Sequence, residues 1–70
     1  MSDLDARLLA AHKAGDKTAL VALYCEAADN ATDIDAACFY LTHAYVFALE
    51  TADPAAGEIR ARLVAERREE

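Results

Sequence analysis

Apolar residues recur every three or four positions in four segments of the chain, which is the spacing of one face of an α-helix. The clearest stripe consists of Leu20, Leu23, Tyr24, Ala27 and Ala28. A longer one consists of Ile34, Ala37, Cys38, Leu41, Ala44, Tyr45 and Ala48. Weaker stripes consist of Leu4, Leu8 and Ala11 near the start and of Ala56, Ile59 and Leu63 near the end. The pattern predicts four amphipathic helices.

Turn and capping residues separate these segments. We expect Ser2 or Asp3 to cap the first helix and Gly15 to end it, because glycine accepts the left-handed conformation of a helix end. Asp16 is then expected to cap a second helix over residues 17–29. Short connections of this kind favour antiparallel neighbours.

The two later helices have start signals of their own. Thr32 is expected to cap the third helix, which would run to about Glu50. Asp53 followed by Pro54 is a typical helix start, with aspartate as the cap and proline in the first helical position. We expect this fourth helix to run to about Arg68.

Length and composition agree with one all-α domain spanning residues 1–70. Eighteen of the 70 residues are alanine, which favours helices and lets them approach closely. β-branched residues are too few for a sheet. A chain this short has a thin core and no room for a large closed active-site cavity.

The predicted third helix carries a second apolar set outside its inward stripe. Phe39, Val46 and Phe47 lie on this second face, with His43 among them. A helix that is apolar nearly all round must be covered on most sides. Three short helices rich in alanine are not expected to cover all of it, so this face is a candidate binding surface.

The turns also resemble those of tetratricopeptide (TPR) repeats. The residues that carry the resemblance are Gly15-Asp16 at a turn, then Tyr24 and Ala27, and Leu41-Thr42 with Ala44-Tyr45 in the third helix. The resemblance implies two degenerate helical hairpins in a right-handed stack. It also implies a concave surface formed by Leu9, His12 and Lys13 from the first helix and by Ala36, Phe39, His43, Val46 and Phe47 from the third. An up-down four-helix bundle is the alternative fold.

Charge and hydropathy narrow the possible partners. The net charge is −6, and no basic residue lies between Lys17 and Arg60. Nucleic acids and anionic membranes attract basic surfaces, so neither is an expected partner. The longest uncharged segment, Ala36–Leu49, is too short to span a bilayer. The start of the chain is acidic and has no apolar signal segment, so we expect a cytoplasmic protein with Cys25 and Cys38 reduced.

The sequence contains little that indicates catalysis. The soft metal ligands His12, His43, Cys25 and Cys38 lack the close paired spacing of zinc sites. No nucleophile motif or glycine-rich phosphate loop is present. We therefore expect no enzyme, no catalytic residue, no metal site and no cofactor.

Two functions follow as hypotheses. The favoured one is a small protein-interaction module that self-associates into a homo-oligomer or binds a partner helix or peptide. Its predicted binding residues are Leu9, His12, Lys13, Phe39, His43, Val46 and Phe47. The alternative is a helical protein that binds a small molecule or a metal through His43, Tyr40, Tyr45 and the cysteines.

Overall fold

The computed structural model describes residues 3–67, and all of its regular secondary structure is α-helical. The helices are α1 (Asp3–Ala14), α2 (Lys17–Asn30), α3 (Ile34–Glu50) and α4 (Ala56–Arg67). The predicted all-α class with four helices is confirmed. Ser2 as a possible cap and the expected end at Arg68 lie outside the described residues.

Aspartate side chains cap the two central helices. Asp16 Oδ1 accepts a hydrogen bond of 3.1 Å from the amide of Ala19 at the start of α2. Asp33 Oδ1 accepts one of 2.8 Å from the amide of Ala36 at the start of α3. The Asp16 prediction is confirmed, whereas the Thr32 prediction is wrong by one residue, because a carboxylate oxygen at position 33 reaches the free amide.

Two helices end in the same way. Gly15 has φ +67°, and the amide of Asp16 donates to the carbonyl of Ala11 over 3.0 Å. After α3, Ala52 has φ 54°, and the amide of Asp53 donates to the carbonyl of Ala48 over 2.8 Å. Both are left-handed helix ends, one with the favoured glycine and one with an alanine.

The fourth helix starts two residues later than predicted. Asp53 Oδ1 accepts from the amide of Ala55 over 2.9 Å, and the Asp53 carbonyl accepts from the amide of Ala56. This turn includes Pro54, so the proline precedes the helix that begins at Ala56.

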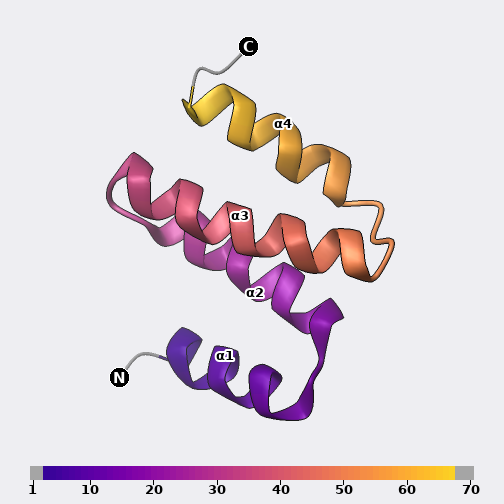
Figure 1. The fold of residues 1–70 in the computed structure, drawn as a ribbon. Helices are drawn as coiled ribbons and strands as arrows, with labels where there is room; N and C mark the ends of the chain where they lie inside the picture. Colours follow the sequence, from indigo (N-terminus) through magenta and orange to yellow (C-terminus); the bar gives the residue numbers. More distant parts are fainter. Residues whose placement is uncertain (1–2, 68–70) are drawn as a thin grey trace.

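Extensive packing among the described helices joins consecutive pairs: α1 with α2, α2 with α3, and α3 with α4. In Figure 1, α1 and α4 lie at opposite ends of the stack, and α1 and α3 run in the same direction with α2 reversed. The Cα atoms span 36 × 28 × 12 Å, so the described chain is flat. This is the arrangement of helical hairpins laid side by side, and the TPR-like repeat itself stays a prediction.

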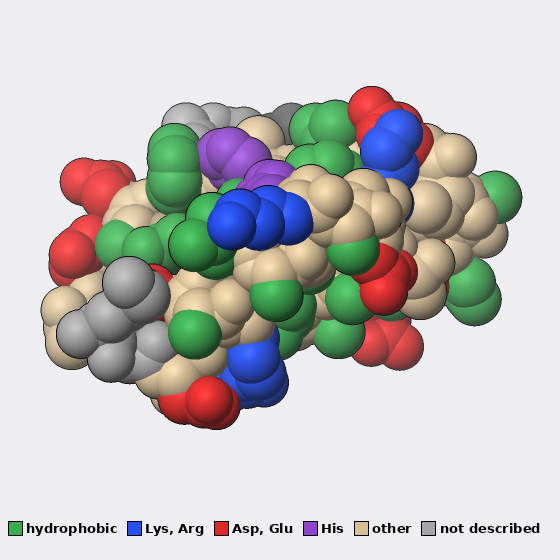
Figure 2. All heavy atoms as spheres, turned by 90° about the horizontal axis from the view of Figure 1, so that it is seen from below, with side chains coloured by type: hydrophobic (Ala, Val, Ile, Leu, Met, Phe, Trp, Pro, Cys, Tyr) green, Lys and Arg blue, Asp and Glu red, His purple; other side chains and the backbone are tan. Residues whose placement is uncertain are grey.

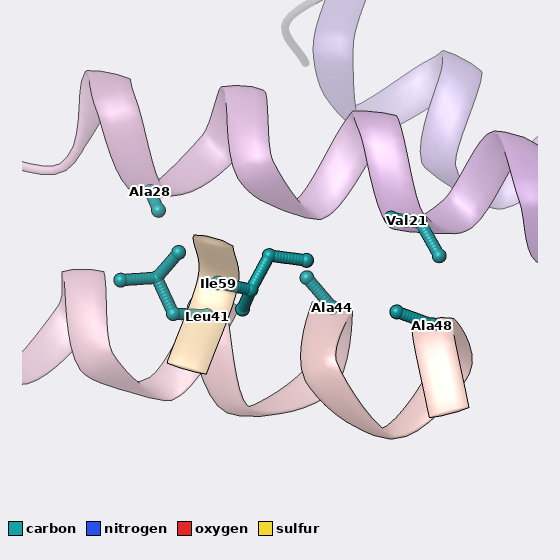
Figure 3. Close-up of a cluster of buried hydrophobic side chains, with 6 residues drawn as sticks. All are labelled: Val21, Ala28, Leu41, Ala44, Ala48 and Ile59. Carbon is teal, nitrogen blue, oxygen red and sulfur yellow. The ribbon is translucent and has the colours of Figure 1, made fainter. Parts of the chain in front are cut away.

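The core lies where α2, α3 and α4 meet. One cluster of buried residues here consists of Val21, Ala28, Leu41, Ala44, Ala48 and Ile59. Figure 3 shows Ala44 and Ala48 on the side of α3 that faces α2, with Ala44 beside Ile59 of α4. Small side chains at these positions let the helix axes approach closely, because little volume separates them.

The inward stripe of α3 was predicted correctly except at its first residue. Leu41 has no exposed surface, whereas Ile34 is 51% exposed. The N-terminal end of α3 and the C-terminal part of α4 border an open hollow of about 360 Å³ that includes Ile34, Arg62 and Glu66. No neighbouring helix therefore covers Ile34, and its predicted place in the core is wrong.

Candidate functional site

The predicted binding residues lie on α1 and α3, and α2 lies between these two helices. We call the set Leu9, His12, Lys13, Phe39, His43, Val46 and Phe47 the α1/α3 face. α1 and α3 run in the same direction, and the reversed α2 lies between them (Figure 1). The structure brings part of this set together through Tyr24 of α2.

Tyr24 is the centre of an aromatic cluster. Its ring stacks on His43, with ring centroids 5.1 Å apart, and on Phe47, at 6.0 Å. His12 of α1 meets Tyr24 edge-on at 5.9 Å and Phe47 at 6.2 Å. At the other side of His43, the ring of Phe39 lies 4.5 Å away. The cluster thus connects three helices and holds His12, His43 and Phe47 on one surface.

Hydrogen bonds fix both histidine rings. His12 Nε2 lies 2.9 Å from the hydroxyl oxygen of Tyr24. His43 Nδ1 lies 3.0 Å from the main-chain carbonyl oxygen of Phe39. A carbonyl oxygen accepts only, so Nδ1 of His43 carries the proton, and in the neutral ring Nε2 is the acceptor.

Several apolar side chains of the α1/α3 face remain exposed. Phe39 is 58% exposed, Leu9 51% and Val46 46%. Val46 also lines a hollow of about 240 Å³ together with Thr42, His43 and Phe47. Figure 2 shows the histidine side chains (purple) among hydrophobic side chains (green), with a basic side chain (blue) beside them. The face therefore combines projecting apolar groups with a small recess.

The same face has a second hollow towards the N-terminal ends of α1 and α3. Its volume is about 300 Å³, and its lining includes Leu4, Leu8, Ala27, Ala36 and Tyr40. The ring of Tyr40 lies 6.2 Å from that of Tyr24, so the hollow adjoins the aromatic cluster.

Sequence reasoning placed Tyr24 in the inward stripe of α2 and did not include it in the site. The Tyr24 ring belongs both to the inward stripe of α2 and to the site, because it is half-buried under the α1/α3 face. The available signal was its likeness to the conserved aromatic position of the TPR pattern. Tyr40 entered only through the alternative hypothesis. Leu9 and Lys13 are exposed on α1.

Ion pairs connect the helices around the site. Arg7 of α1 donates two hydrogen bonds to the Glu26 carboxylate of α2, at 3.2 and 2.7 Å, and also pairs with Asp3 at 3.0 Å. Lys17 pairs with Glu50 at 3.0 Å, where α2 begins and α3 ends. The hydrogen bonds from Arg7 hold the pKa of Glu26 below its ordinary value. These contacts fix α1 and α3 relative to α2.

A further ion pair connects α4 with α2. Arg62 of α4 pairs with Asp29 of α2 at 2.8 Å.

Cys25 is half-buried on α2 and Cys38 is buried on α3, and both are free thiols. Burial raises the pKa of Cys25. A raised thiol pKa disfavours the thiolate, which is the nucleophilic form.

Among residues 3–67, no group of three or more His, Cys, Asp and Glu side chains is placed to hold a metal ion. None of the helices in the same range is long and apolar enough to cross a membrane.

Comparison with models of known families, with curated proteins and with solved structures gives no match for this chain.

Proposed function

We propose that this chain is a small protein-interaction module that binds through the α1/α3 face. The observation that carries the proposal is the exposure of Phe39 and Val46 on α3, at a recess lined by His43 and Phe47, together with the exposure of Leu9 on α1. Exposed apolar groups gathered on one surface of a small domain are typical of a site that is covered by a partner.

The shape of the face supports a helical or extended partner. α1 and α3 run in the same direction over α2, and hollows lie at both ends of the aromatic cluster. An amphipathic helix binds such a groove by inserting apolar side chains from successive turns. The partner is either another protein or a second copy of this chain, which would make a homo-oligomer.

The ring contacts of the site supply rigidity rather than reactivity. Tyr24 holds His12, His43 and Phe47 in fixed positions, so little side-chain entropy is lost when a partner binds. The proposal accordingly includes no catalytic residue and no cofactor. It also excludes nucleic acid and membrane as partners, given the net charge of −6, and it places the chain in the cytoplasm.

The alternative, a small-molecule or metal-binding protein, uses His43, Tyr40, Tyr45 and the cysteines. These residues do not converge on one pocket. His43 and Tyr40 belong to the aromatic cluster, whereas Cys38 is buried in the core. Ligand pockets normally enclose most of the ligand surface with convergent polar groups. We therefore favour the interaction module.

Affinity capture tests the proposal. Tagged wild type, Phe39→Asp and Val64→Asp are compared in a lysate of the native cells. Val64 is an exposed apolar residue on α4 and serves as the matched control. We expect proteins retained by the wild type and by Val64→Asp to be lost with Phe39→Asp. Equal recovery by all three variants contradicts the proposal.

A further inference from the structure

We infer that the partner on the α1/α3 face is a second copy of this chain, with the two α3 helices packed antiparallel and Phe39 of each copy inserted into the recess of the other. The inference rests on the proposed function and specifies its partner. It is carried by the relative positions of one projecting ring and one hollow on the same helix.

The exposed Phe39 ring and the recess match in size and in their positions along α3. The Phe39 side chain is exposed and lies one turn before the recess formed by Thr42, His43, Val46 and Phe47. The recess volume is about 240 Å³. A cavity of about 150 Å³ is enough to hold benzene in an engineered protein, so this recess has room for a phenyl ring. Phe39 projects from its own helix and is displaced along the axis from its own recess.

Two-fold symmetry turns that displacement into two equivalent contacts. An axis through the middle of α3, near Thr42, places Phe39 of each copy over the recess of the other. A contact of this kind is self-complementary and closes the assembly at two copies. A parallel arrangement in register would instead set Phe39 against Phe39 and leave both recesses empty.

The charges at the two ends of the face agree with the antiparallel arrangement. Asp33 and Asp35 lie at the start of α3, and Asp5 lies in the first half of α1. Lys13 lies at the end of α1 and Lys17 at the start of α2, where Lys17 engages Glu50. Asp16 and Glu50 lie at the same end as these two lysines, so that end is close to neutral. The two-fold axis brings the acidic end of one copy to this near-neutral end of the other, whereas a parallel arrangement would place the two acidic ends together.

The accessible surface of the chain is also large enough for a dimer interface of standard size. A specific interface of standard size covers about 800 Å² on each partner. That is about a sixth of the 4602 Å² of accessible surface of this chain. The stack is flat, 36 × 28 Å across and 12 Å thick, so one broad side can supply this area.

Sedimentation velocity from micromolar to millimolar concentration provides the first test. We expect the wild type and Val64→Asp to form dimers and Phe39→Asp to remain monomeric or to dissociate at concentrations higher by about tenfold or more. The side chain of Phe39 is exposed, so circular dichroism of Phe39→Asp should match that of the wild type. A wild type that is monomeric throughout, or a Phe39→Asp variant that dimerises normally, overturns the inference.

Disulfide cross-linking tests the direction of packing. Thr42→Cys places a thiol beside the expected axis, so oxidation should link two copies rapidly. Glu50→Cys places a thiol at the end of α3, far from its counterpart, and should cross-link no faster than the wild type, which controls for Cys25 and Cys38. Faster linking through position 50 than through position 42 contradicts the antiparallel arrangement.

The outcomes separate this inference from the proposed function. A monomeric wild type that still loses captured proteins on Phe39→Asp substitution overturns the second copy as partner and leaves the interaction module standing. A monomeric wild type with equal recovery by all variants removes both.

Discussion

The hydroxyl oxygen of Tyr24 lies 2.9 Å from Nε2 of His12, and this contact joins α2 to α1 at the α1/α3 face. The same tyrosine ring stacks on His43 and Phe47 of α3. One side chain therefore positions groups from two other helices. Its ring and its hydroxyl make separate contributions, and substitutions separate them.

We predict that Tyr24→Ala lowers the free energy of unfolding by about 2–4 kcal/mol, because it removes a half-buried ring and leaves a cavity. Tyr24→Phe keeps the stacked ring and loses one hydrogen bond, which costs about 0.5–1.5 kcal/mol. Urea denaturation followed by circular dichroism measures both values. Equal losses for the two variants would show that ring packing contributes nothing to stability.

The two left-handed helix ends predict effects of opposite sign. Gly15→Ala should destabilise the chain by about 1–2 kcal/mol, since φ +67° is strained for alanine although a Cβ there meets no other atom within 4 Å. Ala52→Gly relieves the same strain at φ 54° and should stabilise, partly offset by glycine's greater unfolded-state entropy. Thermal unfolding of both variants measures the shifts. Shifts of the same sign would refute this account.

Acid should weaken the connection between α1 and α2. Arg7 lowers the pKa of Glu26 below its ordinary value near 4.5. A carboxyl whose folded-state pKa is depressed contributes stability above the unfolded pKa and loses it as the pH falls through the folded pKa. Urea midpoints of the wild type and Glu26→Gln between pH 6 and pH 2 test this. The advantage of the wild type should be present at pH 6 and disappear below pH 4.5; an advantage that grows in acid contradicts it.

The two thiols should differ in alkylation rate. Burial raises the pKa of Cys25, so little thiolate forms at neutral pH. Cys25 is half-buried and Cys38 is 5% exposed, so we expect iodoacetamide to modify Cys25 first and slowly, with the rate rising as the pH is increased. Peptide mass spectrometry of timed samples gives both rates, and the chain in urea is the control. Modification of Cys38 before Cys25 would contradict the prediction.

The helices were predictable because their signals are local. Gly15 and Asp16 act on neighbouring backbone groups, so the turn between α1 and α2 could be placed to the residue. Thr32 and Asp33 are adjacent residues with similar capping ability, so sequence alone did not decide between them. Pro54 was expected inside the fourth helix, and the Asp53 turn holds it outside.

Burial depended on how the helices sit together, which the local pattern does not contain. Val21 was outside the predicted stripe of α2 but is buried, because α3 approaches that side through Ala44 and Ala48. Ile34 has the spacing of a core residue but lies where α3 and α4 leave a hollow. For the candidate site, periodicity identified the exposed face of α3, whereas the role of Tyr24 required knowledge of three helices at once.

The consecutive packing of the four helices also bears on how the chain folds. Each helix finds its main neighbour directly before or after it along the chain, so the loops that must close are short. Local topology of this kind gives a low contact order, and helical domains with low contact order fold in microseconds to milliseconds. We therefore expect rapid formation of the α1/α3 face, with association of two copies as the slower, concentration-dependent step.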